Sequence, residues 1–480
     1  MWRPEEMGRP IPESVHAVSV ALPTWADVVG YEEKRPEAVA RMRSGYPRFV
    51  VHPLVAAIGK RMAPQGVCLP FPSMHAAEMG AAYVSRRSGA EAQIVRDGDL
   101  CGVVTTPEGA GALRAYWQHA GLIVSSRQAE AHLAGKSVNP SAAEFVRASL
   151  RRQLAGFYRC GADDVFLYPT GMAAIFDVLR AVNAWKPARA TAQLGFPYVD
   201  SLKVQQQFGA GVVFIPCSSG VGLEAVQTQL EKQPLAACFT ELPGNPLLEC
   251  LDLTKLAPWL RAREIPLVVD DVVATPINVN LDAHADVIVT SLTKYFAGTG
   301  DVMGGAAMLN PRAPFYGPLK KALRAVHEEL LWIGDAEVLD RQARGFPERM
   351  RGHNAGGLYI AERLKAHPAV EKVWYPKWQS ASAYEAVRRP EGGYGNLLSF
   401  VVKRPEKNAA RVYDALEICK GPTLGTIFTL ACPFTLLAHY GELEWAESCG
   451  VSRWLVRVSV GLEDPEELWQ RFAKALALAG

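Results

Sequence analysis

The sequence predicts an α/β protein built around a mostly parallel sheet, with a smaller α/β domain at the C-terminal end. From about residue 165, short apolar runs alternate with helical segments, and this alternation is typical of strands joined by crossover helices. The runs are almost continuously apolar, as expected when helices cover both faces of a sheet. A long charged helical region near 317–365 precedes two further apolar runs, LLSFVVK and WLVRVSVG, which predict the second sheet.

We expect three parts along the chain. Residues 1–165 form an N-terminal extension of turns and amphipathic stretches, residues 166–324 form the large domain, and residues 325–480 form the small C-terminal domain. A chain of 480 residues is long enough for two or three domains with a large buried core.

The composition argues against several classes of function. The net charge of +2 offers no electrostatic attraction for nucleic acid or an acidic membrane. No apolar run approaches the roughly 18 residues that a membrane span needs, and the first ten residues are not typical of a signal peptide. The nine cysteines are scattered without a CxxC pair, which favours a reducing cytoplasm over a disulfide framework or a metal site.

Five polar or glycine-containing segments directly follow predicted strands: YPTGM, GFPY, ELPGNP, DDVV and TSLTK. Ligands of open α/β sheets bind outside the carboxyl ends of the strands. We therefore expect these five segments to converge on one site.

The segment SLTKYFAGTGDVMGG, residues 291–305, contains the candidate nucleophile, Lys294. A lysine attacks an aldehyde when burial or a nearby cation lowers its pKa. Ser291 and Thr293 offer hydroxyl groups to a phosphate. Taken alone, a lysine after an apolar strand is more often an ordinary surface residue, so its interpretation depends on the other segments.

Two of those segments suit a phosphorylated pyridine. Thr170 and Gly171 begin a helix, and free N–H groups at a helix N-terminus bind phosphate. Asp270 ends a buried strand, where a carboxylate needs a partner, and a protonated pyridine nitrogen is such a partner. Tyr198 offers a flat ring for stacking and Asn245 a hydrogen-bond donor. Each residue alone has a simpler structural explanation, such as a helix cap, and only their combination indicates pyridoxal 5′-phosphate.

The same segments resemble the motifs of the Cys/Met-metabolism family of pyridoxal-phosphate enzymes, the cystathionine γ-synthase group. Family patterns SSGMAA, YGGTYRLF, ESPxNP, VVDNTFATP, SxTKYxxGHSDVxGG and VRLSVGLED appear, in unbroken order, as PTGMAA, YVDSLKVQ, ELPGNP, VVDDVVATP, SLTKYFAGTGDVMGG and VRVSVGLED. GYPRFVVHPL and WQHAGLIVSSRQAE narrow the resemblance to the fungal-type members, which have a longer N-terminal part. The resemblance implies the aspartate-aminotransferase architecture, known as fold type I.

The resemblance also implies a role for each matching residue. The cofactor would bond covalently to Lys294 and be held by Gly171, Met172, Tyr198, Asn245, Asp270, Ser291 and Thr293. Lys294 and Tyr198 would be catalytic. Arg457 matches the arginine that grips the substrate α-carboxylate, and Thr423 lies where the family has a carboxylate-binding serine.

Several positions depart from the family pattern; the family's GHSD, for example, is GTGD here. The family clamps the phosphate with a Tyr-x-Arg pair from the neighbouring subunit. Arg127 fits the order along the chain better, and we favour it slightly, whereas Tyr46 and Arg48 supply the tyrosine as well. Phe428 replaces a glutamate that lies near the distal end of the family's substrate.

The expected reaction is γ-replacement, in which cysteine displaces the acyl group of an O-acylhomoserine to give cystathionine. The succinyl, acetyl and phosphoryl esters all remain open as substrates. Alternatives are direct use of sulfide, as in an O-acylhomoserine sulfhydrylase, and a cystathionine or methionine γ-lyase. A non-catalytic pyridoxal-phosphate-binding protein is a further alternative, against which Lys294 and Arg457 argue. The resemblance implies a homo-oligomer, a dimer or tetramer, with shared active sites.

Overall fold

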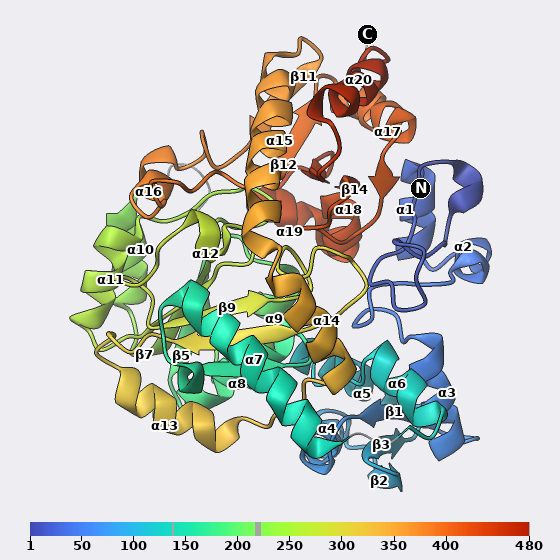
Figure 1. Ribbon diagram of the computed structural model, residues 1–480, viewed down its shortest axis with the longest axis vertical. Coiled ribbons are helices and arrows are strands. Elements are labelled where there is room, and N and C mark those ends of the chain that lie inside the picture. Colours follow the sequence, from blue (N-terminus) through green and yellow to red (C-terminus); the bar gives the residue numbers. More distant parts are fainter. Residues whose placement is uncertain (137–138, 217–221, 480) are drawn as a thin grey trace.

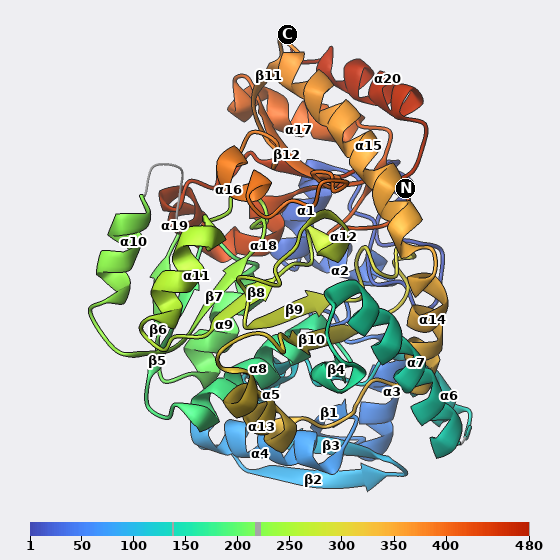
Figure 2. The same ribbon diagram turned by 60° about the vertical axis from the view of Figure 1, so that its left-hand side comes forward.

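A computed structural model of the protein describes residues 1–136, 139–216 and 222–479. Three sheets organise this part of the chain (Figures 1 and 2). The first has the order β1 (Val67–Phe71), β3 (Leu100–Thr105), β2 (Ala92–Asp97). The second has the order β4 (Val165–Tyr168), β10 (Gly305–Leu309), β9 (Val287–Ser291), β8 (Leu267–Asp270), β7 (Leu235–Glu241), β5 (Ala190–Leu194), β6 (Val212–Ile215). The third has the order β11 (Val370–Trp374), β12 (Leu397–Val402), β15 (Val456–Ser459), β14 (Leu430–Pro433), β13 (Cys419–Lys420).

The large sheet is mixed but mostly parallel, as predicted. Strands β5 to β9 pair in parallel, and β10 pairs antiparallel with both β4 and β9. Strand β4 therefore runs in the same direction as the parallel strands, and its carboxyl end reaches the same edge. The antiparallel strand β10, GAAML, was not among the predicted strands.

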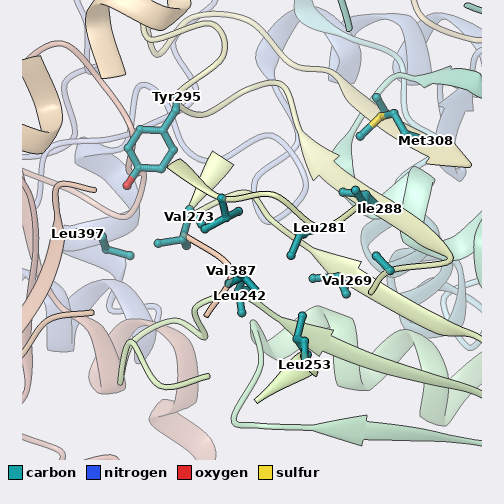
Figure 3. Close-up of a cluster of buried hydrophobic side chains, with 14 of the residues drawn as sticks. Leu242, Leu253, Val269, Val273, Leu281, Ile288, Tyr295, Met308, Val387 and Leu397 are labelled. Carbon is teal, nitrogen blue, oxygen red and sulfur yellow. The ribbon is translucent and has the colours of Figure 1, made fainter. Parts of the chain in front are cut away.

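Both faces of this sheet are buried, which explains the continuously apolar strands. Val165 and Leu167 of β4 face one hydrophobic cluster, and Phe166 and Tyr168 face another. Figure 3 shows part of the first cluster, in which Val269 of the sheet lies with residues such as Leu253 and Leu397. This cluster joins the large sheet to the C-terminal part of the chain.

Helices cover both faces of the large sheet. Helix α8 (Gly171–Trp185) packs on β4, β9 and β10 and contacts α13 (Tyr316–Val326). Helix α7 (Pro140–Tyr158) packs on β4 and on α14 (Ile333–Ala343). The remaining helices of this part are α9 (Val199–Phe208), α10 (Leu223–Leu230), α11 (Leu253–Arg261) and α12 (Thr275–Asn278).

The C-terminal part begins with the long helix α15 (Phe346–Ala366), which runs from the large sheet to the small one (Figure 1). The predicted charged helical region is thus three helices, α13, α14 and α15. The small sheet carries the predicted strands β12 and β15. The further helices of this part are α16 (Ala381–Glu385), α17 (Pro405–Ala415), α18 (Phe434–His439), α19 (Leu443–Ser448) and α20 (Pro465–Leu476).

The N-terminal part has a sheet of its own, which the sequence patterns did not predict. Its helices are α1 (Trp25–Glu32), α2 (Pro36–Arg41), α3 (Pro53–Met62), α4 (Met74–Ser88), α5 (Ala110–Ala120) and α6 (Ser126–Leu133). Helix α1 lies beside the C-terminal part (Figure 1), where the Trp25 ring stacks on Trp454 with 5.8 Å between ring centroids. Among the described residues, no helix is long and apolar enough to cross a membrane.

Candidate active site

A cavity of about 600 Å³ opens at the carboxyl edge of the large sheet. Eight of the predicted site residues line it: Gly171, Met172, Tyr198, Asn245, Asp270, Ser291, Lys294 and Arg457. They come together because parallel strands present their carboxyl ends at one edge. In the register of β7 and β8, for example, Glu241 pairs with Asp270, so both strands end at the same height.

Lys294 is a buried amine in the wall of the cavity. Its Nζ donates a 2.9 Å hydrogen bond to the hydroxyl of Thr423 and lies 4.5 Å from the centroid of the Tyr46 ring. Burial lowers the pKa of this amine, and the positive charges of Arg457 and Arg48 lower it further, against the opposing effect of Tyr46. The neutral amine that this favours is the nucleophilic form.

The start of helix α8 forms a cradle for an anion. The Thr170 hydroxyl caps the helix by accepting a 3.0 Å hydrogen bond from the Ala173 amide, while the first amides, those of Gly171 and Met172, border the cavity. Ser291 lies directly opposite. A Cβ added at Gly171 would come within 2.8 Å of the Ser291 Cβ, so only glycine permits this approach.

Asp270 is a buried carboxyl at the end of β8, and a carboxylate there suits a protonated pyridine nitrogen. Burial raises the pKa of this carboxyl to about 7, and its Oδ1 accepts a 2.9 Å hydrogen bond from the Val272 amide. A bound cation would stabilise the ionised form. A buried carboxyl, a desolvated lysine and an anion cradle on one cavity together fit pyridoxal phosphate.

Arg457 lies at the junction between the two larger sheets and is 5% exposed. Its Nη2 donates to the carbonyl oxygens of Pro422 and Thr423 at 2.6 and 3.2 Å, and its Nη1 donates to Asn245 Oδ1 at 3.3 Å. Thr423 therefore contacts Arg457 through its backbone and Lys294 through its side chain. These contacts hold the guanidinium in one orientation at the cavity.

Two predicted cofactor contacts have other partners in the structure. Thr293 does not line the cavity, because its hydroxyl points back into its own loop and accepts a 3.1 Å hydrogen bond from the Gly304 amide. Arg127 does not line it either. Its guanidinium pairs with Asp301 at 3.2 Å and Asp335 at 3.3 Å. Tyr46 and Arg48, the alternative pair, both line the cavity of their own chain. The preference for Arg127 stays a prediction, because the family pattern places the clamp on a neighbouring subunit.

Other cavity residues were not identified from the sequence. Glu241 ends β7 and accepts a 2.6 Å hydrogen bond from the Tyr198 amide; burial and the neighbouring Asp270 raise its pKa to about 8. Its place at the end of an apolar strand was a signal that could have identified it. The N-terminal part contributes more wall residues: Tyr31, Glu32, Lys34, Val39, Met42, Phe49, Val50, Arg114 and Gln118. No sequence motif indicated that these residues line the cavity.

Phe428, at the position of the family's glutamate, packs instead against a small hydrophobic cluster that includes Ile11 and Leu430.

Together, the mixed sheet, the buried lysine after β9, the cradle at α8 and the carboxyl at the end of β8 define a fold type I pyridoxal-phosphate enzyme. The model of the family described as Cys/Met metabolism PLP-dependent enzyme matches residues 121–477. The chain belongs to this family and depends on pyridoxal phosphate.

The similarity to named relatives extends over almost the whole chain. A cystathionine gamma-synthase of Neurospora crassa is 33% identical, with 99% of each chain covered. An L-2-amino-4-chloropent-4-enoate dechlorinase/desaturase of Streptantibioticus cattleyicolor is 34% identical, with 98% of each covered. Among solved structures, cystathionine gamma synthase from Xanthomonas oryzae pv. oryzae in complex with cystathionine matches with a TM-score of 0.62 and 25% identity, over 72% of this chain and 88% of that one.

Proposed function

We propose that this enzyme is a cystathionine γ-synthase, which replaces the acyl group of an O-acylhomoserine by cysteine to give cystathionine. The fungal relative that bears this name supports the proposal, since it is 33% identical over nearly the whole chain. The name of the Streptantibioticus relative places its chlorine on carbon 4 of an amino acid, which is the γ carbon. Both names therefore describe reactions at the γ carbon of an amino acid.

The link between Lys294 and Arg457 through Thr423 is the observation that carries this proposal. The Thr423 hydroxyl accepts from Lys294 Nζ, and its carbonyl oxygen accepts from Arg457 Nη2. An amino acid whose α-carboxylate binds Arg457 therefore has its Cα on the side of Lys294. Binding and proton transfer are coupled by one short loop, residues 422–425.

Bound pyridoxal phosphate supplies an electron sink for the charge that develops at Cα and Cβ. Lys294 is the proton carrier in this proposal, because burial favours its neutral amine, which takes a proton from Cα and moves protons at Cβ. Asp270 would hold the pyridine nitrogen in its protonated form. Tyr198 would stack on the ring, and Gly171, Met172 and Ser291 would bind the phosphate.

The proposal is tested by assaying the purified holoenzyme with the succinyl, acetyl and phosphoryl esters of homoserine, each with cysteine or with sulfide. We expect cystathionine from at least one ester with cysteine, at a higher kcat/KM than homocysteine from the same ester with sulfide. Faster homocysteine formation would make the enzyme a sulfhydrylase. Release of ammonia and a 2-keto acid from cystathionine or methionine alone, without γ-replacement, would make it a γ-lyase.

We also infer that the enzyme is a homo-oligomer, a dimer or tetramer, of the cytoplasm. The family resemblance supports the assembly. The eight described cysteines are free thiols, which suits a reducing compartment. Light scattering of the purified protein measures the assembly, and fractionation of the source cells tests the location.

A further inference from the structure

One buried carboxyl forms hydrogen bonds to two loops of the cavity. Glu241, the last residue of β7, lines the cavity and is 8% exposed. Its Oε1 accepts a 2.6 Å hydrogen bond from the Tyr198 amide, and its Oε2 accepts a 3.3 Å hydrogen bond from the Asn245 amide. Tyr198 follows β5 and Asn245 follows β7, so each oxygen holds a loop that leaves a different strand.

These two loops lie side by side at the carboxyl edge of the large sheet. Strands β5 and β7 pair in parallel, with Leu194 beside Thr240, so the segments that follow them leave the sheet at neighbouring positions. A Cβ added at Gly244 would lie 3.3 Å from the Phe196 carbonyl oxygen, which shows how closely the loops approach each other. Glu241 lies at the base of both loops.

Tyr198 is held at both ends. Its amide donates to Glu241, and its hydroxyl accepts a 2.7 Å hydrogen bond from Arg48 Nη2. When the amide and the hydroxyl of a tyrosine are both hydrogen-bonded, its ring stays in one orientation, which a residue that would stack on the cofactor ring requires. Glu241 fixes the end of Tyr198 that lies nearest the sheet.

Asn245 is likewise held through its backbone and its side chain. Its amide donates to Glu241, and its Oδ1 accepts a 3.3 Å hydrogen bond from Arg457 Nη1. Because a guanidinium group only donates, the atom that faces Arg457 is the side-chain oxygen, and Nδ2 is the group that can donate to another partner. Asn245 therefore joins the candidate cofactor site to the arginine proposed to bind the substrate carboxylate.

Glu241 performs this task beside a second buried carboxyl. In the register of the large sheet it pairs with Asp270, and burial together with the charge of Asp270 raises the pKa of Glu241 to about 8. Two buried carboxyls this close do not ionise together readily, so Asp270, whose pKa is raised to about 7, is the one that ionises first. Glutamine resembles a protonated glutamate in size and keeps an acceptor oxygen, which makes Glu241→Gln a conservative variant.

We propose that Glu241 is a positioning residue for the cofactor: its carboxyl holds the amides of Tyr198 and Asn245, so that the stacking ring and the side-chain amide are in place before the cofactor binds. Loops that are already ordered lose less conformational freedom on binding, and the affinity for the cofactor is higher for this reason. The inference rests on the proposed function only for the roles of Tyr198 and Asn245 toward the cofactor.

Three substitutions of Glu241 separate its hydrogen bonds from its charge. Glu241→Met has a similar length without a carboxyl oxygen, Glu241→Gln keeps an acceptor for the Tyr198 amide, and Glu241→Asp keeps the carboxyl but is one methylene shorter. We expect the affinity of the apoenzyme for pyridoxal phosphate to fall roughly ten- to a hundredfold in Glu241→Met and Glu241→Asp, and by less than about fivefold in Glu241→Gln. Titration followed by visible absorbance measures these affinities.

Visible circular dichroism of the bound cofactor is the second readout, because it depends on how the cofactor ring lies against its neighbours. We expect the signal per bound cofactor to decrease in Glu241→Met and to return in Glu241→Gln. Glu224→Gln is the matched control, since Glu224 lies at the exposed start of α10 outside the cavity, and it should behave as the wild type.

Wild-type affinity and circular dichroism in Glu241→Met would overturn the proposal, and so would a Glu241→Gln protein that loses as much as Glu241→Met. If melting of the apoenzyme shows that Glu241→Met does not fold, the other two variants decide: weaker binding in Glu241→Asp than in Glu241→Gln supports the proposal, and the reverse order overturns it. None of these measurements uses a substrate. A failed assay for cystathionine would therefore refute the proposed reaction and leave the role of Glu241 standing.

Discussion

Tyr158 donates a 3.1 Å hydrogen bond to Asp271, the carboxyl that directly follows Asp270 at the end of β8. Asp271 is 1% exposed, and burial together with the negative charge of Asp270 raises its pKa to about 8. The aligned family pattern has an asparagine here. A protonated carboxyl offers both a donor and an acceptor, as a side-chain amide also does, so a neutral Asp271 can take the place of asparagine.

We expect Asp271→Asn to change the pH dependence of stability. The folded pKa of Asp271 lies above the unfolded value of 3.8, so its contribution to stability is complete below pH 3.8 and is lost as the pH rises through about 8. The melting temperature of the variant minus that of the wild type should therefore increase between about pH 5 and about pH 9. Scanning calorimetry of both holoenzymes measures this difference. A difference that does not vary with pH would show that Asp271 is already ionised.

Lys294→Ala should abolish both turnover and the visible absorbance of the covalently held cofactor, because the chain then lacks the amine that bonds it and moves the protons. Absorbance spectra and a product assay check this outcome. Lys255→Ala is the matched control, since its side chain is 71% exposed and lies outside the cavity. Survival of both signals in Lys294→Ala would refute the assignment of the nucleophile.

Gly171→Ala should weaken cofactor binding, because the new Cβ would lie within 2.8 Å of the Ser291 Cβ and push apart the two sides of the anion cradle. Titration of the apoenzyme with pyridoxal phosphate measures the loss. Gly156→Ala is the control: nothing lies within 4 Å of its Cβ, and it should stabilise helix α7 by about 0.5–1 kcal/mol. Equal cofactor affinity in both variants would contradict a close approach at Gly171.

Arg457→Lys should raise KM for the amino-acid substrate and lower kcat/KM by roughly ten- to a hundredfold, since lysine cannot make the paired hydrogen bonds of a guanidinium to a carboxylate. The visible spectrum of the bound cofactor should remain, which separates substrate binding from cofactor loss. Steady-state kinetics with varied O-acylhomoserine checks the result. An unchanged KM would place the α-carboxylate elsewhere.

Glu32→Gln should change the KM of at least one substrate severalfold, because Glu32 lines the cavity and a carboxylate there attracts the ammonium group of an amino acid. Burial raises the pKa of Glu32 to about 7, so the wild-type KM should vary with pH in this range more strongly than that of the variant, in which only other cavity groups such as Asp270 titrate. Kinetics across this range give the comparison. Glu33→Gln removes the same charge one residue away, outside the cavity, and should leave both KM values unchanged.

Predictions from local patterns succeeded where neighbouring residues decide the structure. The apolar run before Asp270 predicted a strand, and the helix after Thr170 begins where its capping residue indicated. Strand β10 was missed because it directly follows the glycine-rich lysine motif, to which its first residue, Gly305, belongs. The sheet β1-β3-β2 was missed because burial does not alternate regularly along its strands.

The sequence by itself determined the α/β fold class and the set of strand ends that form the cavity, because parallel strands must present their carboxyl ends at one edge. Only the tertiary structure decided which arginine lines the cavity of its own chain. Arg127 and Arg48 have the same chemistry and both pair with carboxylates, but Asp301 and Asp335 hold Arg127 outside the cavity, whereas Asp200 holds Arg48 beside Tyr198 in the cavity wall. Which arginine lies at the cavity depends on contacts between segments that are distant in the sequence, and no local pattern encodes such contacts.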